Sequence, residues 1–321
     1  MNKLLNAVAS DAQIDAQTRS QKEAEACVEP AADQLHEAFP SMFHVPERTR
    51  GNNRARTKAA CVLCFVLLLV IAVASVLLSP LATSSNLANQ NFAPSAEHLF
   101  GTDRLGRDMF IRTLSGLSTS IGIGLLAALV SSLIALVLGM IAALGGKRAD
   151  AAVTWLVDLM MSVPHIVLLI LISFALGRGF TGVVVGVALT HWPSLCRVVR
   201  AEVLQVKQSP YVALAQQMGK SPVEIALKHI FPAVLPQLLC GLILLFPHAI
   251  LHESAITFLG FGLSPDMPAI GVILSEAMNY LSAGMWWLAL FPGISLVLVV
   301  LLFDVAGQGV RRILDPHQSQ K

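Results

Sequence analysis

The sequence predicts an all-α integral membrane protein with six transmembrane helices and both termini in the cytoplasm. Of its 321 residues, 55% are hydrophobic and only 13% are charged, and the mean hydropathy is +0.68. An ordinary globular domain carries about 25% charged residues. Long uncharged intervals recur along the chain, and basic residues gather in the segments between them. If each interval crosses the membrane once, most of these basic segments lie on the same side of the membrane.

Composition and charge exclude several other classes of protein. The scarcity of charge argues against a soluble enzyme. The net charge of +2 provides no basic excess for binding nucleic acid. The cysteines are too scattered for a disulfide framework and are interpreted as small apolar residues. They are Cys27, Cys61, Cys64, Cys196 and Cys240.

Residues 1–58 form a polar tail, which is expected to lie in the cytoplasm and to be poorly ordered or partly helical. The tail holds eight acidic and eight basic residues. The first long apolar run, 59–79, begins too late for a secretory signal peptide. It ends before Pro80 and is long enough to cross a bilayer once. An external loop is expected at 80–112.

Five further spans are expected within a core at 113–316, followed by a short tail at 317–321. Backbone polar groups in hydrocarbon must be satisfied within each segment, which favours helices. The uncharged or nearly uncharged intervals are 113–146, 151–177, 179–196 extended toward 200, 230–264 and 277–303. A second external loop is expected at 264–285.

Orientation follows from the distribution of basic residues, which concentrate on the cytoplasmic side of membrane proteins. With six spans, the bases before the first span, Lys147 and Arg148, the bases in 197–228, and those at 311–312 all fall on one side. The opposite side receives four arginines: Arg104, Arg107, Arg112 and Arg178. Both termini are therefore expected in the cytoplasm.

The loop at 207–231, between the fourth and fifth spans, carries the clearest local signals. Gly219 breaks a helix-forming stretch, and a second helix is expected from Ser221 to a stop at Pro232. Ser221 followed by Glu224 is a capping box, with proline at the favoured first helical position. A compact helix-turn-helix is predicted on the cytoplasmic face. A partner is expected to cover its apolar residues, Val223, Ile225, Ala226 and Leu227.

This loop resembles the signature cytoplasmic loop of ABC importer permeases. That pattern is Tyr-x-x-Ala-Ala-x-x-x-Gly, five spacer residues, Ile, three more residues and His-x-x-Pro. The matching residues are Tyr211, Ala215, Gly219, Ile225, His229 and Pro232. Two family positions differ, since Ala213 stands where a Glu is usual and Leu214 replaces the first of the paired alanines. The resemblance implies that the loop couples the chain to a separate ATP-hydrolysing subunit.

The resemblance covers roughly residues 97–316. Within the ABC importer permeases, the chain is most similar to the dipeptide, oligopeptide and nickel group, and within that group to the second permease subunit, which has six spans. The resemblance implies the type I ABC importer permease fold. Other motifs of the group occur in this chain in the same order. They are the segment 98–108, Asp158 with Pro164, Glu253 followed by Gly260, and Trp286 and Trp287 ahead of Pro292. Two usual aspartates near the end are replaced by Gln308 and Arg312.

The external stretch 98–108 places Gly101 and Gly106 among four charged side chains. This pattern predicts a tight, ion-paired turn, and contact with a substrate-delivering protein is the alternative.

No ATP site is expected in this chain. The sequence at 219–221 resembles the end of a phosphate-binding loop, but leucine occupies position 214, where the earlier glycine is required, and no strand is expected before it. ATP is therefore expected to be used by partner subunits. The chain is expected to bind no cofactor and to be no enzyme.

Six ionisable residues inside the spans are candidates for the translocation path, because such groups are costly in hydrocarbon unless they face a cavity or a partner. They are Asp158, His165, His191, His248, His252 and Glu253. His248 and His252 are four residues apart on one helix face, which makes them candidate ligands for the transient binding of a transition metal or its chelate. The alternative is hydrogen bonding between helices of the bundle.

The predicted function is that of a permease subunit of an ATP-driven ABC importer in the bacterial inner membrane, forming half of the pore. The cargo stays open between small peptides and nickel or other metal chelates. The expected partners are a homologous permease, one or two ATPase subunits, an external substrate-binding protein and membrane lipid, with no nucleic acid. A secondary, ion-coupled transporter and a membrane receptor or scaffold are the two alternatives.

Overall fold

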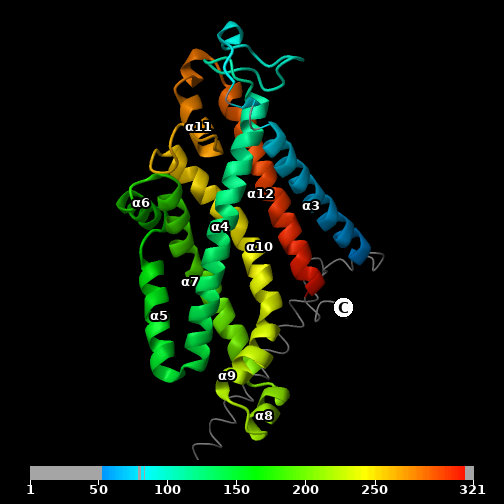
Figure 1. Ribbon diagram of the computed structural model, residues 1–321, viewed down its shortest axis with the longest axis vertical. Coiled ribbons are helices and arrows are strands. Elements are labelled where there is room, and N and C mark those ends of the chain that lie inside the picture. Colours follow the sequence, from blue (N-terminus) through cyan, green and yellow to red (C-terminus); the bar gives the residue numbers. More distant parts are fainter. Residues whose placement is uncertain (1–52, 79–80, 83, 315–321) are drawn as a thin grey trace, which may run out of the picture. The chain divides into compact units, whose positions relative to one another are not determined.

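The computed structural model describes residues 53–78, 81–82 and 84–314, and these residues are almost entirely helical (Figure 1). Within them the structure has no strand, and one isolated bridge pairs Thr102 with Asp108. The predictions for residues 1–52 and 315–321 lie outside the described residues. The elements are α3 (Asn53–Leu78), η2 (Leu87–Asn89), α4 (Met109–Leu144), α5 (Gly146–Ser162), α6 (His165–Ala175), α7 (Gly179–Lys207), α8 (Pro210–Gln217), α9 (Pro222–Ile225), η3 (Ala226–Ile230), α10 (Phe231–Phe258), α11 (Ile270–Met278), η4 (Leu281–Ala283) and α12 (Trp287–Leu314).

Five segments of the described chain are helical, long and apolar enough to cross a membrane: α3, α4, α7, the run from α9 through α10, and α12. A sixth candidate is the pair α5 and α6, which meet at 95°. The end of α4 lies beside the end of α7, where Lys207 Nζ donates to Ala143 O (3.3 Å). The start of α7 lies beside the end of α10, where Gly179 N–H donates to Gly262 O (2.9 Å). The bent pair therefore carries the chain between opposite ends of α7, and counting it as one span brings the candidate spans of the described chain to six.

The break between α5 and α6 divides the span expected at 151–177. Val163 is extended (φ −90°, ψ 137°) and precedes Pro164. A residue before proline is disfavoured in the helical region, because the proline ring collides with its backbone and Cβ. The apolar run is continuous in sequence, but the helix is interrupted at this dipeptide.

The expected external loop at 80–112 is shorter in the structure, since α4 begins at Met109. Asp108 caps this helix by accepting hydrogen bonds from the N–H groups of Phe110 (2.8 Å) and Ile111 (3.2 Å). The last charge before the apolar interval, Arg112, lies inside α4. It is paired there with carboxylates, so a charged residue does not mark the helix boundary.

The expected second external loop at 264–285 contains a further helix, α11, with buried Ile270, Val272 and Ile273. The last membrane helix begins at Trp287, ten residues later than the uncharged interval that starts at position 277. A turn separates the two helices and ends at Gly284 in the left-handed region (φ +83°). The uncharged interval therefore joins the end of one helix to the start of the next.

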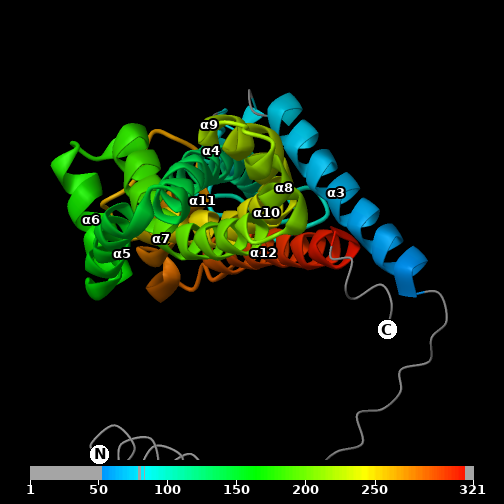
Figure 2. The same cartoon turned by 90° about the horizontal axis from the view of Figure 1, so that it is seen from below.

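The central helices α4, α7 and α10 pack closely on one another, with α5 and α6 to one side and α3 to the other (Figure 2). Small residues of α4 make this approach possible. A Cβ on Gly139 would lie 2.8 Å from Val199 Cγ1 of α7, and a Cβ on Gly124 would lie 2.6 Å from Ile250 Cγ1 of α10. Two buried apolar clusters result, and one of them includes residues of α8 and α9.

The four cysteines of the described chain are free and buried, as interpreted from the sequence: Cys61, Cys64, Cys196 and Cys240.

Candidate functional site

The segment from α8 to η3, here called the coupling segment (residues 209–232), folds as the predicted helix-turn-helix. Prolines at the first helical position begin both α8 and α9. Between the helices, Gly219 adopts φ +76°, a conformation that costs other residues free energy. Ser221 Oγ accepts the N–H of Glu224 (3.2 Å), which confirms the N-terminal cap.

The second half of the predicted capping box is replaced by ion pairs. The Glu224 carboxylate accepts from Lys220 Nζ (2.7 Å) and Lys228 Nζ (3.0 Å). These i,i+4 contacts on the helix surface tie the glycine turn to the following helix.

The expected stop at Pro232 is wrong, because the helix continues from η3 into α10. In a regular α-helix, proline removes one hydrogen bond and its ring collides with the carbonyl four residues earlier. Here η3 is a π-helical turn, in which Phe231 N–H donates to Ala226 O. This wider turn interrupts the regular pattern directly before Pro232.

Two of the signature residues, Ala215 and Ile225, are buried, together with Val212 and Ile230, and belong to one apolar cluster with side chains of α4, α5 and α7. The ring centroids of Tyr211 and His229 lie 6.4 Å apart. The coupling segment is therefore packed against the membrane helices and does not stand free of them.

The coupling segment also exposes several large apolar side chains. These residues, here called the coupling surface, are Tyr211, Leu214, Met218, Val223 and Leu227, with exposed fractions of 47–70%. The sequence singled out Val223 and Leu227 by their apolar character. It did not single out Met218, which lies one helical turn after Leu214.

Among the intramembrane candidates, Asp158 and Glu253 have partners of their own. Asp158 pairs with Arg197 (2.6 Å), and both side chains are about half exposed. Glu253 is fully buried and accepts from the hydroxyls of Ser254 and Thr257 (both 3.1 Å). Neither residue lines the cavity described next.

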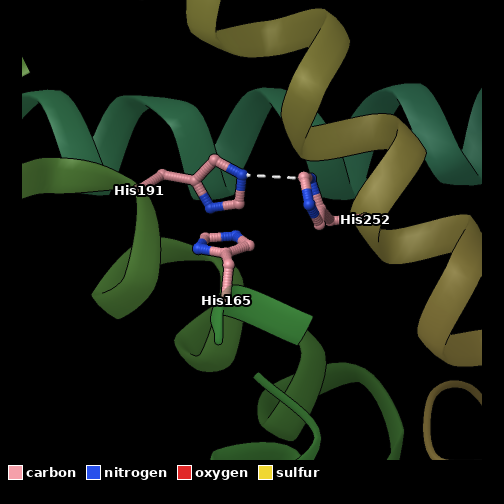
Figure 3. A group of neighbouring side chains, drawn as sticks. All are labelled: His165, His191 and His252. Atoms are coloured by element: carbon pink, nitrogen blue, oxygen red, sulfur yellow. Dashed lines mark hydrogen bonds between the residues drawn. The ribbon is translucent and has the colours of Figure 1, made fainter. Parts of the chain in front are cut away.

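The four histidine candidates line one cavity of about 610 Å³ between α6, α7 and α10. Three of them form a cluster in which the rings of His165, His191 and His252 point toward one another from three different helices (Figure 3). Ring centroids are 4.5–4.9 Å apart. His191 Nε2 lies 3.4 Å from His252 Nδ1.

The predicted pair of His248 and His252 is only partly reproduced by this geometry. The imidazole of His248 is exposed and stands outside the three-ring cluster, although its backbone oxygen lies 2.7 Å from His252 Nδ1. The spacing of four residues correctly predicted that His248 and His252 lie on one face of the same helix. The rings that meet His252 come instead from α6 and α7, and no local pattern reveals them.

The turn at residues 98–108, here called the outer turn, is ion-paired, as its glycines and charges predict. Asp103 accepts from Arg107 (2.6 Å) and from Arg112 (3.2 Å), and Arg112 also donates to Glu276 of α11 (2.7 Å). The role of Glu276 could not be predicted, because it lies 164 residues from its partner.

Comparison with known proteins identifies the family to which this chain belongs. Residues 135–320 match the family described as binding-protein-dependent transport system inner membrane component. The dipeptide transport system permease protein DppC of Bacillus subtilis is 32% identical over 278 residues, covering 86% of this chain and 87% of the relative. The chain belongs to this permease family.

Other relatives agree with that assignment. A putative peptide transport system permease protein of Brucella abortus is 38% identical, covering 78% of this chain and 86% of the relative. The oligopeptide transport system permease protein OppC of Bacillus subtilis is 34% identical, covering 73% and 76%.

A solved chain of the MetNI methionine ABC transporter has the same fold, with a TM-score of 0.54 and 19% identity over 64% of this permease and 98% of that chain. The predicted helical fold of a type I ABC importer permease is confirmed, and the cytoplasmic placement of the termini stays a prediction. This permease is a multi-pass transport subunit of an ABC importer.

Proposed function

We propose that this permease forms half of the translocation pore of a bacterial inner-membrane importer for small peptides. The relatives named above are described as dipeptide, oligopeptide and peptide transport permeases, which supports a peptide cargo. The proposed partners are a homologous permease, one or two ATPase subunits, an external substrate-binding protein and the surrounding lipid, with no nucleic acid. ATP is used by the partner subunits, and this chain binds no cofactor for that purpose.

The observation that carries the coupling role is the coupling surface. Five large apolar side chains are exposed on one short segment, whose Val212, Ala215, Ile225 and Ile230 are buried. Apolar side chains gathered on an exposed segment are typical of a surface that a partner covers. An ATPase subunit is its proposed occupant, and closure of the ATPase pair moves the segment as a rigid lever. The membrane helices then alternate between inward and outward access, because ATP binding favours one orientation.

The proposed topology places the coupling segment and both termini in the cytoplasm. The basic turn at Lys147 and Arg148 belongs to the same end of the molecule as the coupling segment, since the ends of α4 and α7 meet there (Figure 1). The outer turn and α11 belong to the opposite end, where Arg112 joins them. This division agrees with the positive-inside rule.

A substitution in the coupling surface tests the proposal. Leu214→Asp and Val223→Asp place a charge on side chains that are 58% and 67% exposed, so the permease should fold but no longer copurify with the ATPase subunits. ATP-dependent peptide uptake should fall by at least about tenfold, since about 1.4 kcal/mol of lost docking energy is one factor of ten.

Leu87→Asp is the matched control, because Leu87 is equally exposed (64%) but lies in η2 at the other end of the molecule. It should retain the ATPase subunits. Normal ATPase association in both coupling-surface variants would contradict the proposal. Peptide uptake that persists after deletion of the ATPase genes would favour a secondary transporter, and normal uptake without this chain would favour a receptor or scaffold.

Nickel or another metal chelate is the second candidate cargo, and the imidazoles that line the cavity favour it. Uptake of radiolabelled nickel, cobalt and dipeptides by cells that lack this subunit distinguishes the two. Loss of dipeptide uptake alone supports the peptide, whereas loss of metal uptake supports the chelate.

A further inference from the structure

We propose that His165, His191 and His252 form a binding site for one divalent transition metal ion on the wall of the cavity between α6, α7 and α10. This proposal concerns only the binding of the ion by the three histidines. It does not depend on whether the transported cargo is a peptide or a metal chelate.

The distances suit three-coordinate capture of an ion by imidazoles. One ring nitrogen from each histidine lies within 4.8 Å of the others. In histidine sites, metal–nitrogen bonds are about 2.0–2.1 Å long, which puts ligand nitrogens about 3.3 Å apart in a tetrahedral arrangement. The ring centroids of the three histidines are 4.5–4.9 Å apart, so the rings are in contact. Rotation of the side chains would bring one nitrogen of each ring from within 4.8 Å to the shorter spacing that an ion requires.

Two of the rings have the outer hydrogen bonds that metal-binding histidines use. His191 Nδ1 lies 2.8 Å from Val187 O, and His252 Nδ1 lies 2.7 Å from His248 O. A carbonyl oxygen only accepts, so each Nδ1 carries the proton and each Nε2 keeps its lone pair. Donation of one ring N–H to a backbone carbonyl is the usual way in which a protein orients a histidine ligand and fixes its tautomer.

The third ring supplies an independent observation. His165 Nε2 is buried and has no hydrogen-bond partner among the described residues. Buried polar atoms normally have a partner, and each exception requires an explanation. A metal ion at the centre of the cluster would bind this nitrogen.

The ligand type selects the class of ion. Imidazole nitrogen suits Zn²⁺, Cu²⁺, Ni²⁺ and Co²⁺, whereas Mg²⁺ and Ca²⁺ prefer oxygen ligands. Three protein ligands leave a fourth position open, unlike the closed sites that serve structure alone. The three histidines line the cavity together with Met160, Met161 and His248.

The test uses the full-length permease, purified in detergent with its partner subunits and dialysed against Co²⁺. The expected result is about one Co²⁺ per permease chain, with the visible absorption of tetrahedral cobalt. X-ray absorption should find nitrogen neighbours at about 2.0–2.1 Å. His165→Gln and His252→Gln should each weaken Co²⁺ binding by at least about tenfold, because each removes one of three ligands.

His248→Gln is the matched control, since it removes an exposed imidazole from the same cavity but keeps the backbone oxygen that orients His252. It should bind Co²⁺ as the unaltered chain does. Retention of the partner subunits and an unchanged unfolding temperature show that each variant is folded. The proposal is overturned if the unaltered permease binds no Co²⁺, or if His248→Gln weakens binding as much as His165→Gln does. Either result leaves peptide import untouched, because uptake is measured separately.

Discussion

Gly106 shows how a single residue determines the conformation of the outer turn. Its φ is +68°, and a Cβ at this position would lie 1.7 Å from the carbonyl oxygen of Asn86. The turn that it permits lets Asp103 Oδ1 accept the N–H groups of Leu105 and Arg107 (both 2.9 Å). Glycine is therefore required here for two separate reasons, backbone conformation and space.

Gly106→Ala should destabilise the permease. The left-handed conformation alone costs a residue with a side chain about 1–2 kcal/mol. The collision with Asn86 adds to this cost, because a backbone atom cannot move aside cheaply. The unfolding temperature in detergent measures the effect. Gly122→Ala in α4 is the control, since a Cβ added at Gly122 would have no neighbour within 4 Å and alanine is the better helix former, so it should not lower that temperature. Equal stability of the two variants would contradict the interpretation.

The coupling segment is the element whose local structure the sequence predicts best and whose end it predicts worst. The glycine turn, the Ser221 cap and the start of both helices depend on residues at most three or four positions apart. Continuation through η3 into α10 depends on packing, because Ile225, directly before that turn, and Ile230, its last residue, are buried in a cluster with side chains of the membrane helices.

Ser221→Ala tests the cap. Loss of the hydroxyl that accepts Glu224 N–H should cost about 0.5–2 kcal/mol of local stability. Hydrogen exchange at residues 223–225 should accelerate accordingly, since Pro222 has no backbone N–H.

Ser209→Ala is the matched control for this prediction. Ser209 also precedes a helix-starting proline, but its hydroxyl donates to Val206 O (2.6 Å) and caps no N–H of α8. Exchange in α8 should change little. If both variants accelerate exchange in the helix that follows, the cap is not the cause.

At the scale of the whole molecule, the bent pair α5 and α6 determines the topology. It joins opposite ends of α7, so it covers the same length as that helix. The count of six spans therefore depends on the pair crossing the membrane once. Charge alone supports the same number, since an odd count would place the basic segments on both sides of the membrane.

Cysteine labelling tests this topology in a variant without the five native cysteines. A membrane-impermeant thiol reagent should label Ser95→Cys and Arg178→Cys from the outside of intact cells. Lys147→Cys should react only after the membrane is opened. All three positions are exposed in the structure. Labelling of Arg178→Cys from the cytoplasmic side alone would mean that α5 and α6 re-enter the membrane without crossing it.

By itself, the sequence determined the helical membrane class, the approximate positions of the spans, the glycine turn with its cap and the ion-paired outer turn. These features depend on the length of apolar runs, the sign of nearby charges and contacts between residues close in the chain. Only the tertiary structure decided which distant side chains meet. His191 and His252 are 61 residues apart, and Arg112 and Glu276 are 164 apart. It also decided that α11 is a buried helix and not a loop, because its apolar face is covered by other helices. Such contacts arise from the packing of helices against one another, which no local pattern encodes.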